Sequence, residues 1–562
     1  MPGTFAEQFQ LVEPLLGDTL VRGLPLTVCT GSGISCRRMP MLRRLIARAF
    51  CSTPAPQRLD ALFDYYSRRH MLTARVRQKL SDDLPDPLPL DVFRRLPQPV
   101  QDHACSVLCD YYGDVFRELE RVFGNLQSLL EAINFAEFQG GHPDAAHCYI
   151  AFLLAENTIR ELVTFNWDRL VEIAFEQYVA RPIQETASVI NDCTSWTQRR
   201  YGPSATIVKL HGCASQFPAE IAKIVVTRIH LINASLSERW QVKAMEILFN
   251  NVVLICGFSG GDYDACIGIR KIMFDRRANN LPAPVYYLAQ PSTVDGVSRD
   301  IIEDDNRRHV PLGANDLFAT VYFASIKARL RAAIERGRAL QACNRPFGWD
   351  DDEWASALNR AEVFVNADFP EILDRVIGAP EIRWESEAAS FPIWLSDVRQ
   401  LYLRGEISNR GKYTGLAIQP DKDLTLVLVA SAVVDFLRNK PHINLQLGSS
   451  CWGVSVMNSQ SGSRFQLIPY HGEYAQTAHG AMRAYLERMG RNEKDPPAPK
   501  IVVLPCQGYT QSPDNKLAPG PVLRRRFPGD KEPTEHFIPP QRVFGARNFA
   551  ELKDIVGAEL DA

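Results

Sequence analysis

Four short polar segments of this chain each follow an apolar run, and they carry the side chains best suited to chemistry. They are Thr30–Ser35 (TGSGIS), Thr164–Asp168 (TFNWD), Lys209–Gly212 (KLHG) and Cys256–Asp262 (CGFSGGD). Together they supply a carboxamide, an imidazole and several hydroxyl groups. Because ligands of parallel sheets bind beyond the carboxyl ends of the strands, we expect the four segments to converge at one edge of a sheet.

The glycine turn of the first segment lies between an apolar run, Leu24–Cys29, and a helical pattern, Met41–Arg48. Glycine permits positive φ and lets a ligand approach the main chain closely. The amino end of a following helix favours an anion. The pattern predicts a strand, a tight turn and a helix that hold a nucleotide diphosphate. Taken alone, the turn is equally compatible with an ordinary connection before a helix.

The other polar residues have structural alternatives as well. Asn166 and Asp168 are both good caps for a helix that begins near Arg169, and Asp262 is a good cap for a helix after its own segment. His211 is compatible with a hydrogen-bonded core position. The occurrence of all four segments after predicted strands favours a chemical role over these separate explanations.

In this order, the glycine turn, T-x-N-x-D, L-H-G and G-x-S resemble the sirtuin catalytic core over roughly residues 15–300. The resemblance implies that Asn166 positions the nicotinamide ribose or an attacking water. It implies that His211 is the general base and that Asp168 supports the asparagine loop. We expect Asp262 to contact the same ligand. The remaining NAD+ contacts that the resemblance implies are Gly31, Ser32, Gly33, Ser35, Gly257 and Ser259.

Such side chains suit cleavage of the bond between nicotinamide and ribose. The bond breaks with oxocarbenium character and nicotinamide leaves as a neutral molecule, so the site needs orientation and charge stabilisation more than a strong acid. A histidine that titrates near neutrality can take the proton of the nucleophile.

Two departures from the protein-deacylating sirtuins change the expected activity. Those enzymes carry two C-x-x-C pairs after L-H-G, whereas Cys213 is the only cysteine between His211 and Cys256, so no metal is expected. The segment Cys36–Pro40 lacks their phenylalanine–arginine pair. The chain therefore resembles more closely the zinc-free, sirtuin-like effectors of bacterial antiphage defence.

That resemblance implies an NAD+ hydrolase that releases nicotinamide and ADP-ribose and depletes cellular NAD+ in abortive infection. It also implies a sensor partner, either a short Argonaute with its guide nucleic acid or a nucleotide-sensing subunit, and a homo- or hetero-oligomer. The alternatives are a non-catalytic module that binds ADP-ribose or a related nucleotide for signalling, and a protein ADP-ribosyltransferase.

The bulk composition is that of a globular protein. Of 562 residues, 46% are hydrophobic and 23% charged, and the net charge of -2 argues against a chain-wide surface for polyanions. No apolar run is long enough for a membrane span, and the first residues lack a signal pattern. The 13 cysteines show no C-x-x-C pair. We expect a cytoplasmic chain with free thiols, Cys105 and Cys109 in a core, and no membrane partner.

The fold expected is α/β, with a Rossmann-like parallel sheet, a helical insertion and a second α/β domain. We place the NAD-binding domain at 1–345, its helical insertion at about 52–160, and a regulatory or partner-binding domain at 346–562.

Arginines 37, 38, 43 and 44 are expected on a solvated helix face, with phosphate binding as the alternative. Arginines 524–526 are expected to be solvated, with a nucleic-acid or partner contact as the alternative.

The predicted strands of the first domain are 161–164, 206–210, 252–256 and 285–288, and its predicted helices include 114–123, 145–154 and 326–334. For the second domain we predict strands at 423–429, 442–447 and 500–504, helices at 433–438 and 475–489, and a long ordered loop at 506–545.

Overall fold

The chain divides into two compact units, Glu13–Ala319 and a second unit formed by Met1–Val12 with Thr320–Ala562. The computed structural model describes the first unit more fully than the second. The main described ranges are 3–21, 25–52, 58–80, 84–155, 158–178, 187–198, 205–226, 246–249, 252–257, 285–291, 306–339 and 347–371, with short segments between 424 and 561.

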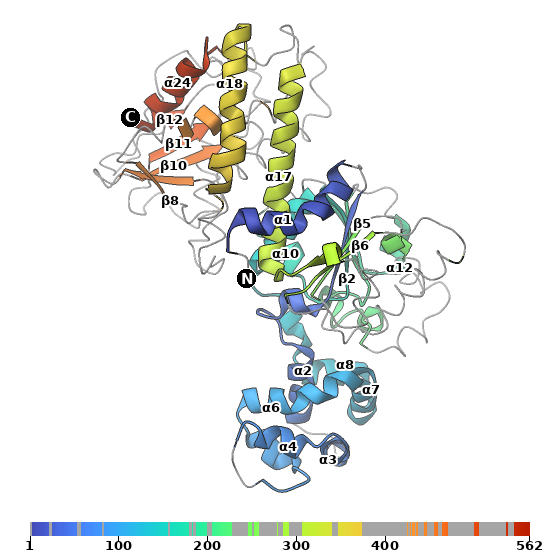
Figure 1. Ribbon diagram of the computed structural model, residues 1–562. Coiled ribbons are helices and arrows are strands. Elements are labelled where there is room, and N and C mark those ends of the chain that lie inside the picture. Colours follow the sequence, from blue (N-terminus) through green and yellow to red (C-terminus); the bar gives the residue numbers. More distant parts are fainter. Residues whose placement is uncertain are drawn as a thin grey trace, which may run out of the picture. The chain divides into compact units, whose positions relative to one another are not determined.

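A seven-stranded, all-parallel sheet forms the centre of the first unit (Figure 1). Its strand order is β3-β4-β2-β1-β5-β6-β7. The sequences of β1, β4 and β5 are apolar runs that are buried along their whole length, as expected for strands covered on both faces. The predicted α/β fold and its four predicted strands are confirmed, whereas β3 and β7 escaped prediction. The strands are β1 Leu26–Thr30, β2 Ile159–Thr164, β3 Ala187–Ile190, β4 Ala205–Lys209, β5 Val252–Cys256, β6 Val285–Ala289 and β7 His309–Val310.

The register of the sheet brings the ends of four strands into one row. Thr30 of β1 pairs with Thr164 of β2 on one side and with Cys256 of β5 on the other. Thr164 in turn pairs with Lys209 of β4. The four polar segments therefore leave the sheet side by side, as the sequence predicted.

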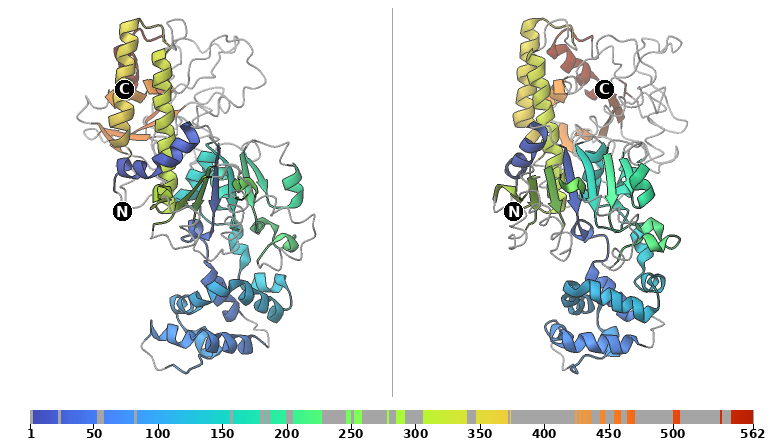
Figure 2. Two further views of the ribbon diagram at one scale, coloured as in Figure 1. Left: turned by 45° about the vertical axis from the view of Figure 1, so that its right-hand side comes forward. Right: turned by 90° about the vertical axis from the view of Figure 1, so that its right-hand side faces the viewer.

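A group of helices is inserted between β1 and β2, and Figures 1 and 2 show it gathered on one side of the sheet. Aromatic rings form much of its core, including Phe50 against Phe63 at 5.0 Å and Phe63 against Phe93 at 4.8 Å between ring centroids. The predicted helices at 114–123 and 145–154 are confirmed as α7 and α9. The helices are α2 Leu42–Cys51, α3 Leu59–Arg69, α4 Leu72–Arg77, α5 Leu90–Arg95, α6 Gln98–Cys105, α7 Tyr112–Phe123, α8 Leu126–Ala132 and α9 Ala145–Ala155.

Helix α9 and helix α10 (Leu170–Tyr178) pack against each other beside the sheet. Every residue of α9 from Ala145 to Leu154 is buried, His147 included. The insertion's cysteines lie where the sequence placed them, because Cys105 is buried in the core and Cys109 packs against it. No helix among the described residues is both long and apolar enough to cross a membrane.

The second unit is also α/β and contains a mixed sheet of order β12-β11-β10-β9-β8. Its strands are β8 Ile443–Gln446, β9 Val454–Asn458, β10 Arg464–Pro469, β11 Lys500–Leu504 and β12 His536–Phe537. The predicted strands at 442–447 and 500–504 are confirmed as β8 and β11. The described helices of this unit include α1 Phe5–Leu16, which ends in the first unit, α17 Ala314–Ala339, which begins in the first unit, α18 Asp351–Val363 and α24 Phe549–Asp561.

One prediction for the second unit is wrong. The described residues between 424 and 435 are helical, whereas the sequence predicted a strand at 423–429. Leu424, Val427, Leu428 and Ser431 are buried, and their spacing of three and four residues marks one face of a helix. The apolar run was continuous, so its period did not distinguish the two structures. The predicted helix at 475–489 and arginines 524–526 lie outside the described residues, as does the predicted loop at 506–545 except for β12 and Gly545.

Candidate functional site

The four polar segments are held at the sheet edge by backbone hydrogen bonds that extend the strand ladders. The amide of Phe165 donates to the Thr30 carbonyl at 3.1 Å, and that of Leu210 donates to the Thr164 carbonyl at 3.0 Å. The amide of Gly31 donates to the Cys256 carbonyl, also at 3.0 Å. The segments thus have fixed positions relative to one another from their first residues.

The glycine turn forms a short 3₁₀ helix, Ser32–Ser35, and α2 begins only at Leu42. Gly33 donates its amide hydrogen to the Gly257 carbonyl at 2.8 Å. A Cβ atom added at Gly33 would lie 2.7 Å from that carbonyl oxygen. Gly257 has φ of +74°, which favours glycine. The close contact between the two turns therefore accounts for glycine at both positions, beside the ligand contacts that the sequence predicts for them.

Ser35 lies at the centre of a buried hydrogen-bond network. The amide of Asp144 donates to Nδ1 of His147 at 3.0 Å, so the imidazole proton resides on Nε2. Nε2 lies 3.0 Å from the Ser35 hydroxyl oxygen, to which it donates. Nδ2 of Asn166 donates to the same oxygen at 3.3 Å. Ser35 therefore links the glycine turn to the asparagine loop, and the sequence had not indicated His147 as a member of this site.

Burial keeps His147 in the neutral form that this network requires. The ring is fully buried, and desolvation lowers its pKa although Asp168 and Asp144 act in the opposite direction. A neutral His147 has one N–H and one acceptor nitrogen, and both are used. Since Ser35 accepts two hydrogen bonds, its own hydroxyl hydrogen is directed away from His147 and from Nδ2 of Asn166.

Asn166 has one polar atom that the described protein does not satisfy. Its amide N–H donates to the Thr164 hydroxyl at 3.1 Å and its Nδ2 to Ser35, whereas its buried Oδ1 has no hydrogen-bond partner among the described residues. A buried polar atom without a partner costs about 1–3 kcal/mol. A bound ligand or a water is one source of the missing donor.

Asp168 caps the helix that follows it. This is the structural role that the sequence analysis gave as the alternative to a role in the site. Its Oδ1 accepts from the amide of Leu170 at 3.1 Å, at the start of α10. The carbonyl of Asp168 also accepts a hydrogen bond from Nζ of Lys209. Asp168 thus fixes the end of the asparagine loop, and Asn166 makes no such capping bond.

Lys209 is fully buried and connects the asparagine loop to the histidine loop. Its Nζ lies 2.9 Å from Oε1 of Glu172 on α10, and both side chains are buried. Desolvation by itself lowers the pKa of Lys209, but the charge of Glu172 outweighs it and the pKa is raised. The ammonium group is therefore charged, and it holds the beginning of α10 against the end of β4.

His211 lies between two aromatic side chains of the asparagine loop. Its ring centroid is 5.2 Å from that of Phe165 and 6.5 Å from that of Trp167. The next residue, Gly212, has φ of +79°, and an added Cβ atom would lie 2.4 Å from the Lys223 carbonyl oxygen. The histidine loop thus has a defined path, and it brings an imidazole beside the loop that carries Asn166.

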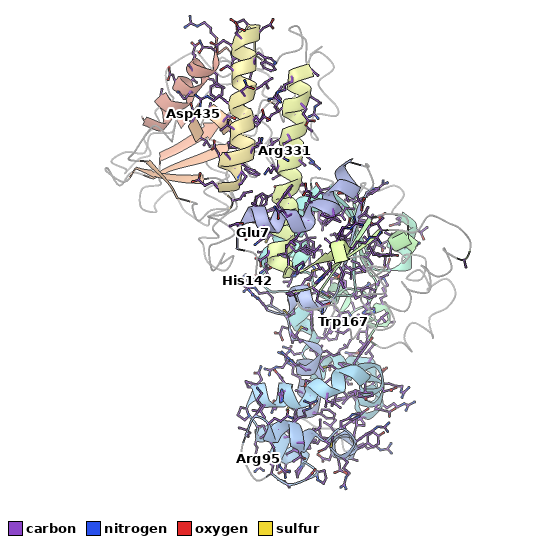
Figure 3. The ribbon with its side chains drawn as sticks, viewed as in Figure 1. Glu7, Arg95, His142, Trp167, Arg331 and Asp435 are labelled. Atoms are coloured by element: carbon purple, nitrogen blue, oxygen red, sulfur yellow. The ribbon has the colours of Figure 1, made fainter. Side chains whose placement is uncertain are left out.

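The helical insertion contacts these loops through Trp167. The indole ring meets Phe135 and Phe138 edge-on at 5.5 and 5.8 Å, and its Nε1 donates to the Val225 carbonyl at 3.1 Å. Nε2 of Gln139 donates to the Ala214 carbonyl at 3.1 Å. Figure 3 shows Trp167 where the sheet and the insertion meet. The insertion is therefore packed on the residues that carry the site.

Two of the four arginines after the glycine turn form ion pairs within the protein. Arg38 lies 3.7 Å from Asp144, and Arg44 lies 3.3 Å from Asp102. The prediction of a solvated helix face is therefore wrong for Arg38 and Arg44, which are half-buried. Arg43 is exposed on α2 as predicted, and Arg37 is exposed in the turn before that helix. Ser259 and Asp262, two predicted ligand contacts, lie outside the described residues. No cluster of metal-ligating side chains occurs in the part of the chain that the structure describes.

A comparison with known families identifies the part of the chain that contains two of these loops. Residues 160–309 match the SIR2-like domain family. The match begins at β2 and includes the asparagine and histidine loops, but it does not reach the glycine turn or His147. SIR2-like domains are enzymes that use NAD+, so NAD+-dependent chemistry fits this segment. No curated protein matches the chain significantly.

Proposed function

We propose that the chain is an NAD+ glycohydrolase that converts NAD+ and water into nicotinamide and ADP-ribose. The observation that carries this proposal is the buried Oδ1 of Asn166, which has no partner among the described residues. It belongs to a loop of the SIR2-like domain at the carboxyl edge of the sheet, in which Nδ2 of Asn166 donates to Ser35 and the neighbouring Phe165 and Trp167 flank the His211 ring. An acceptor at this place can bind a ribose hydroxyl or orient an attacking water.

In the proposed reaction, the asparagine loop orients the substrate or the water and the histidine loop supplies the base. Asn166 is held by Ser35 through Nδ2, which aims its Oδ1 at the substrate or the water. His211 takes the proton from the attacking oxygen as the bond between nicotinamide and ribose breaks. Gly31, Ser32 and Gly33 adjoin the site, where the exposed Ser32 is available to the phosphates. Orientation of the nucleophile and stabilisation of the oxocarbenium-like transition state supply the rate enhancement.

We further propose that the enzyme is an antiphage effector that depletes cellular NAD+ in abortive infection. The resemblance to zinc-free, sirtuin-like effectors supports this role. A sensor partner or the second unit would then control the enzyme. The proposal predicts a fall in cellular NAD+ after infection only in cells that carry the chain and its partner.

The decisive experiment measures nicotinamide and ADP-ribose after incubation of the purified chain with NAD+, with and without the products of neighbouring genes. Asn166→Ala and His211→Ala should each lower the rate by about 10²–10⁴-fold. His142→Ala is the matched control, because His142 is an exposed histidine outside the site (Figure 3) and its loss should leave the rate unchanged.

Two other outcomes would contradict hydrolysis, and a third would contradict the role given to His211. Tight binding of ADP-ribose with no turnover under any activating condition would favour the non-catalytic signalling module. Release of nicotinamide with ADP-ribose attached to protein, instead of free in solution, would favour a transferase. Equal activity of the His211→Ala and His142→Ala proteins would exclude His211 as the base.

A further inference from the structure

The helical insertion carries a group of exposed apolar side chains that have no role in the proposed reaction. Among the described residues, Tyr65, Met71 and Tyr111 are exposed large hydrophobic side chains, at 48%, 70% and 47% of their surface. The rings of Tyr65, Tyr66, His70 and Tyr111 form a continuous row, with centroids 5.2, 5.9 and 4.6 Å apart. The two ends of the row, Tyr65 and Tyr111, are exposed, His70 is half-buried and Tyr66 is buried beneath them. Exposed apolar side chains that gather in one place, rather than singly, mark a binding surface.

The same part of the insertion is strongly basic. Between Tyr65 and Ser81 the chain has no acidic residue. Its five cations are all exposed: Arg68, Arg69, Arg75, Arg77 and Lys79. The guanidinium of Arg69 also lies over the ring of Tyr65, 5.7 Å from its centroid. Aromatic rings and positive charges are thus interleaved on α3 and α4.

The basic residues adjoin the aromatic row along α4. Arg75 lies on α4, Met71 caps its amino end in the left-handed conformation, and Lys79 follows its last turn, and all three side chains are exposed. Gln78 contacts His103 of α6 at 3.3 Å. Helix α6 packs against both α4 and α2, so Arg75, Lys79 and Arg43 lie on neighbouring segments. Burial, then the charges of these three cations, lower the pKa of His103. The surface therefore extends from Tyr111 to α2.

The acidic groups near this surface have partners of their own, and Asp86 accepts a hydrogen bond from the Thr73 hydroxyl at 3.0 Å. Asp64 pairs with Arg68 at 2.9 Å. Beyond the aromatic row, Asp114 pairs with Arg117 and Glu118 with Arg121, each at 2.8 Å. Within the described ranges, Arg43, Arg75 and Lys79 have no such ion pair. Their charge is available to an anionic ligand.

We propose that this surface, the basic aromatic face, binds single-stranded nucleic acid. It comprises Arg43, Tyr65, His70, Arg75, Lys79 and Tyr111. Cations that track a phosphate backbone and aromatic rings that stack with unpaired bases are the two features by which proteins bind single strands. A duplex hides its bases from such rings, and an acidic chain such as polyglutamate has no aromatic ring for them to stack with.

The test uses the full chain and a fluorescein-labelled oligothymidylate of about 20 nucleotides, with fluorescence anisotropy as the readout. Tyr111→Ala should weaken binding about tenfold, the effect of removing one stacked base. Arg75→Glu with Lys79→Glu should weaken it further and lower the salt dependence by roughly 0.7 per lost cation. Arg331→Glu, an exposed arginine of the other unit, is the control and should bind as the unaltered chain does.

Each other outcome overturns the proposal. Equal or tighter binding of a duplex, with no effect of Tyr111→Ala, would reduce the face to a general electrostatic surface. Equal binding of polyglutamate would assign it to an acidic protein. Absence of binding at low salt, or an equal loss in Arg331→Glu, would show that the face is not the nucleic-acid site. None of these results depends on NAD+ turnover.

Discussion

Replacement of Ser35 by alanine tests whether the network around His147 exists as described. The hydroxyl oxygen of Ser35 accepts from Nε2 of His147 at 3.0 Å and from Nδ2 of Asn166 at 3.3 Å. Its loss leaves the N–H of a fully buried imidazole without an acceptor. Such a group costs about 1–3 kcal/mol, and the second donor adds to that cost. We therefore expect Ser35→Ala to lower the free energy of unfolding by about 1–3 kcal/mol for the imidazole N–H alone, and by more when the second donor is included.

Urea unfolding followed by circular dichroism measures this difference, and Ser32→Ala provides a matched control. Ser32 lies three residues away in the same 3₁₀ turn but is exposed, so its replacement should change stability by less than about 0.5 kcal/mol. Equal stability of the two variants would refute the assignment of the imidazole proton to Nε2 and the role of Ser35 as its acceptor.

The remaining predictions concern buried groups of the same unit. The pKa of His147 is lower in the folded protein than its unfolded value of about 6.5. Neutral His147 therefore stabilises the fold above that pH. As the pH falls below it, the free energy of unfolding decreases by at most about 1.4 kcal/mol per pH unit. Urea titrations at several pH values should show a shallower acid dependence for His147→Gln. Gly33→Ala should cost about 1–3 kcal/mol of unfolding free energy, because its Cβ would collide with the Gly257 backbone, and thermal unfolding would detect it. Lys209→Met should cost about 3–5 kcal/mol by leaving Glu172 buried and unpaired, and Lys209→Met with Glu172→Leu should recover part of this loss in the same assay.

The arrangement of the site at the sheet edge was predictable because each loop follows a buried, β-rich run. Apolar strands such as Val252–Cys256 are recognisable from their sequence, and in a parallel sheet their carboxyl ends lie at the same edge. The confirmed neighbours are Thr30, Thr164, Lys209 and Cys256. Periodicity and turn chemistry were sufficient for this much.

The contribution of His147 was not predictable on the same grounds. It lies within an apolar helix, and its partner Ser35 is 112 residues away, so no local pattern connects the two. The contact between Gly33 and Gly257 is equally non-local, because it depends on how two turns pack. A histidine within an otherwise apolar helix that precedes a strand was the one available signal.

The place at which the helical insertion enters the sheet has a consequence for how this architecture can diversify. The insertion connects β1 to β2, two strands that are neighbours in the sheet and whose register aligns Thr30 with Thr164. The ladder, not the length of the connection, therefore sets the separation of the glycine turn and the asparagine loop. The helices between α2 and α9 can therefore differ in number and size without moving Asn166 away from Ser35, provided that α9 keeps His147 against Ser35 and that Trp167 keeps its apolar contacts.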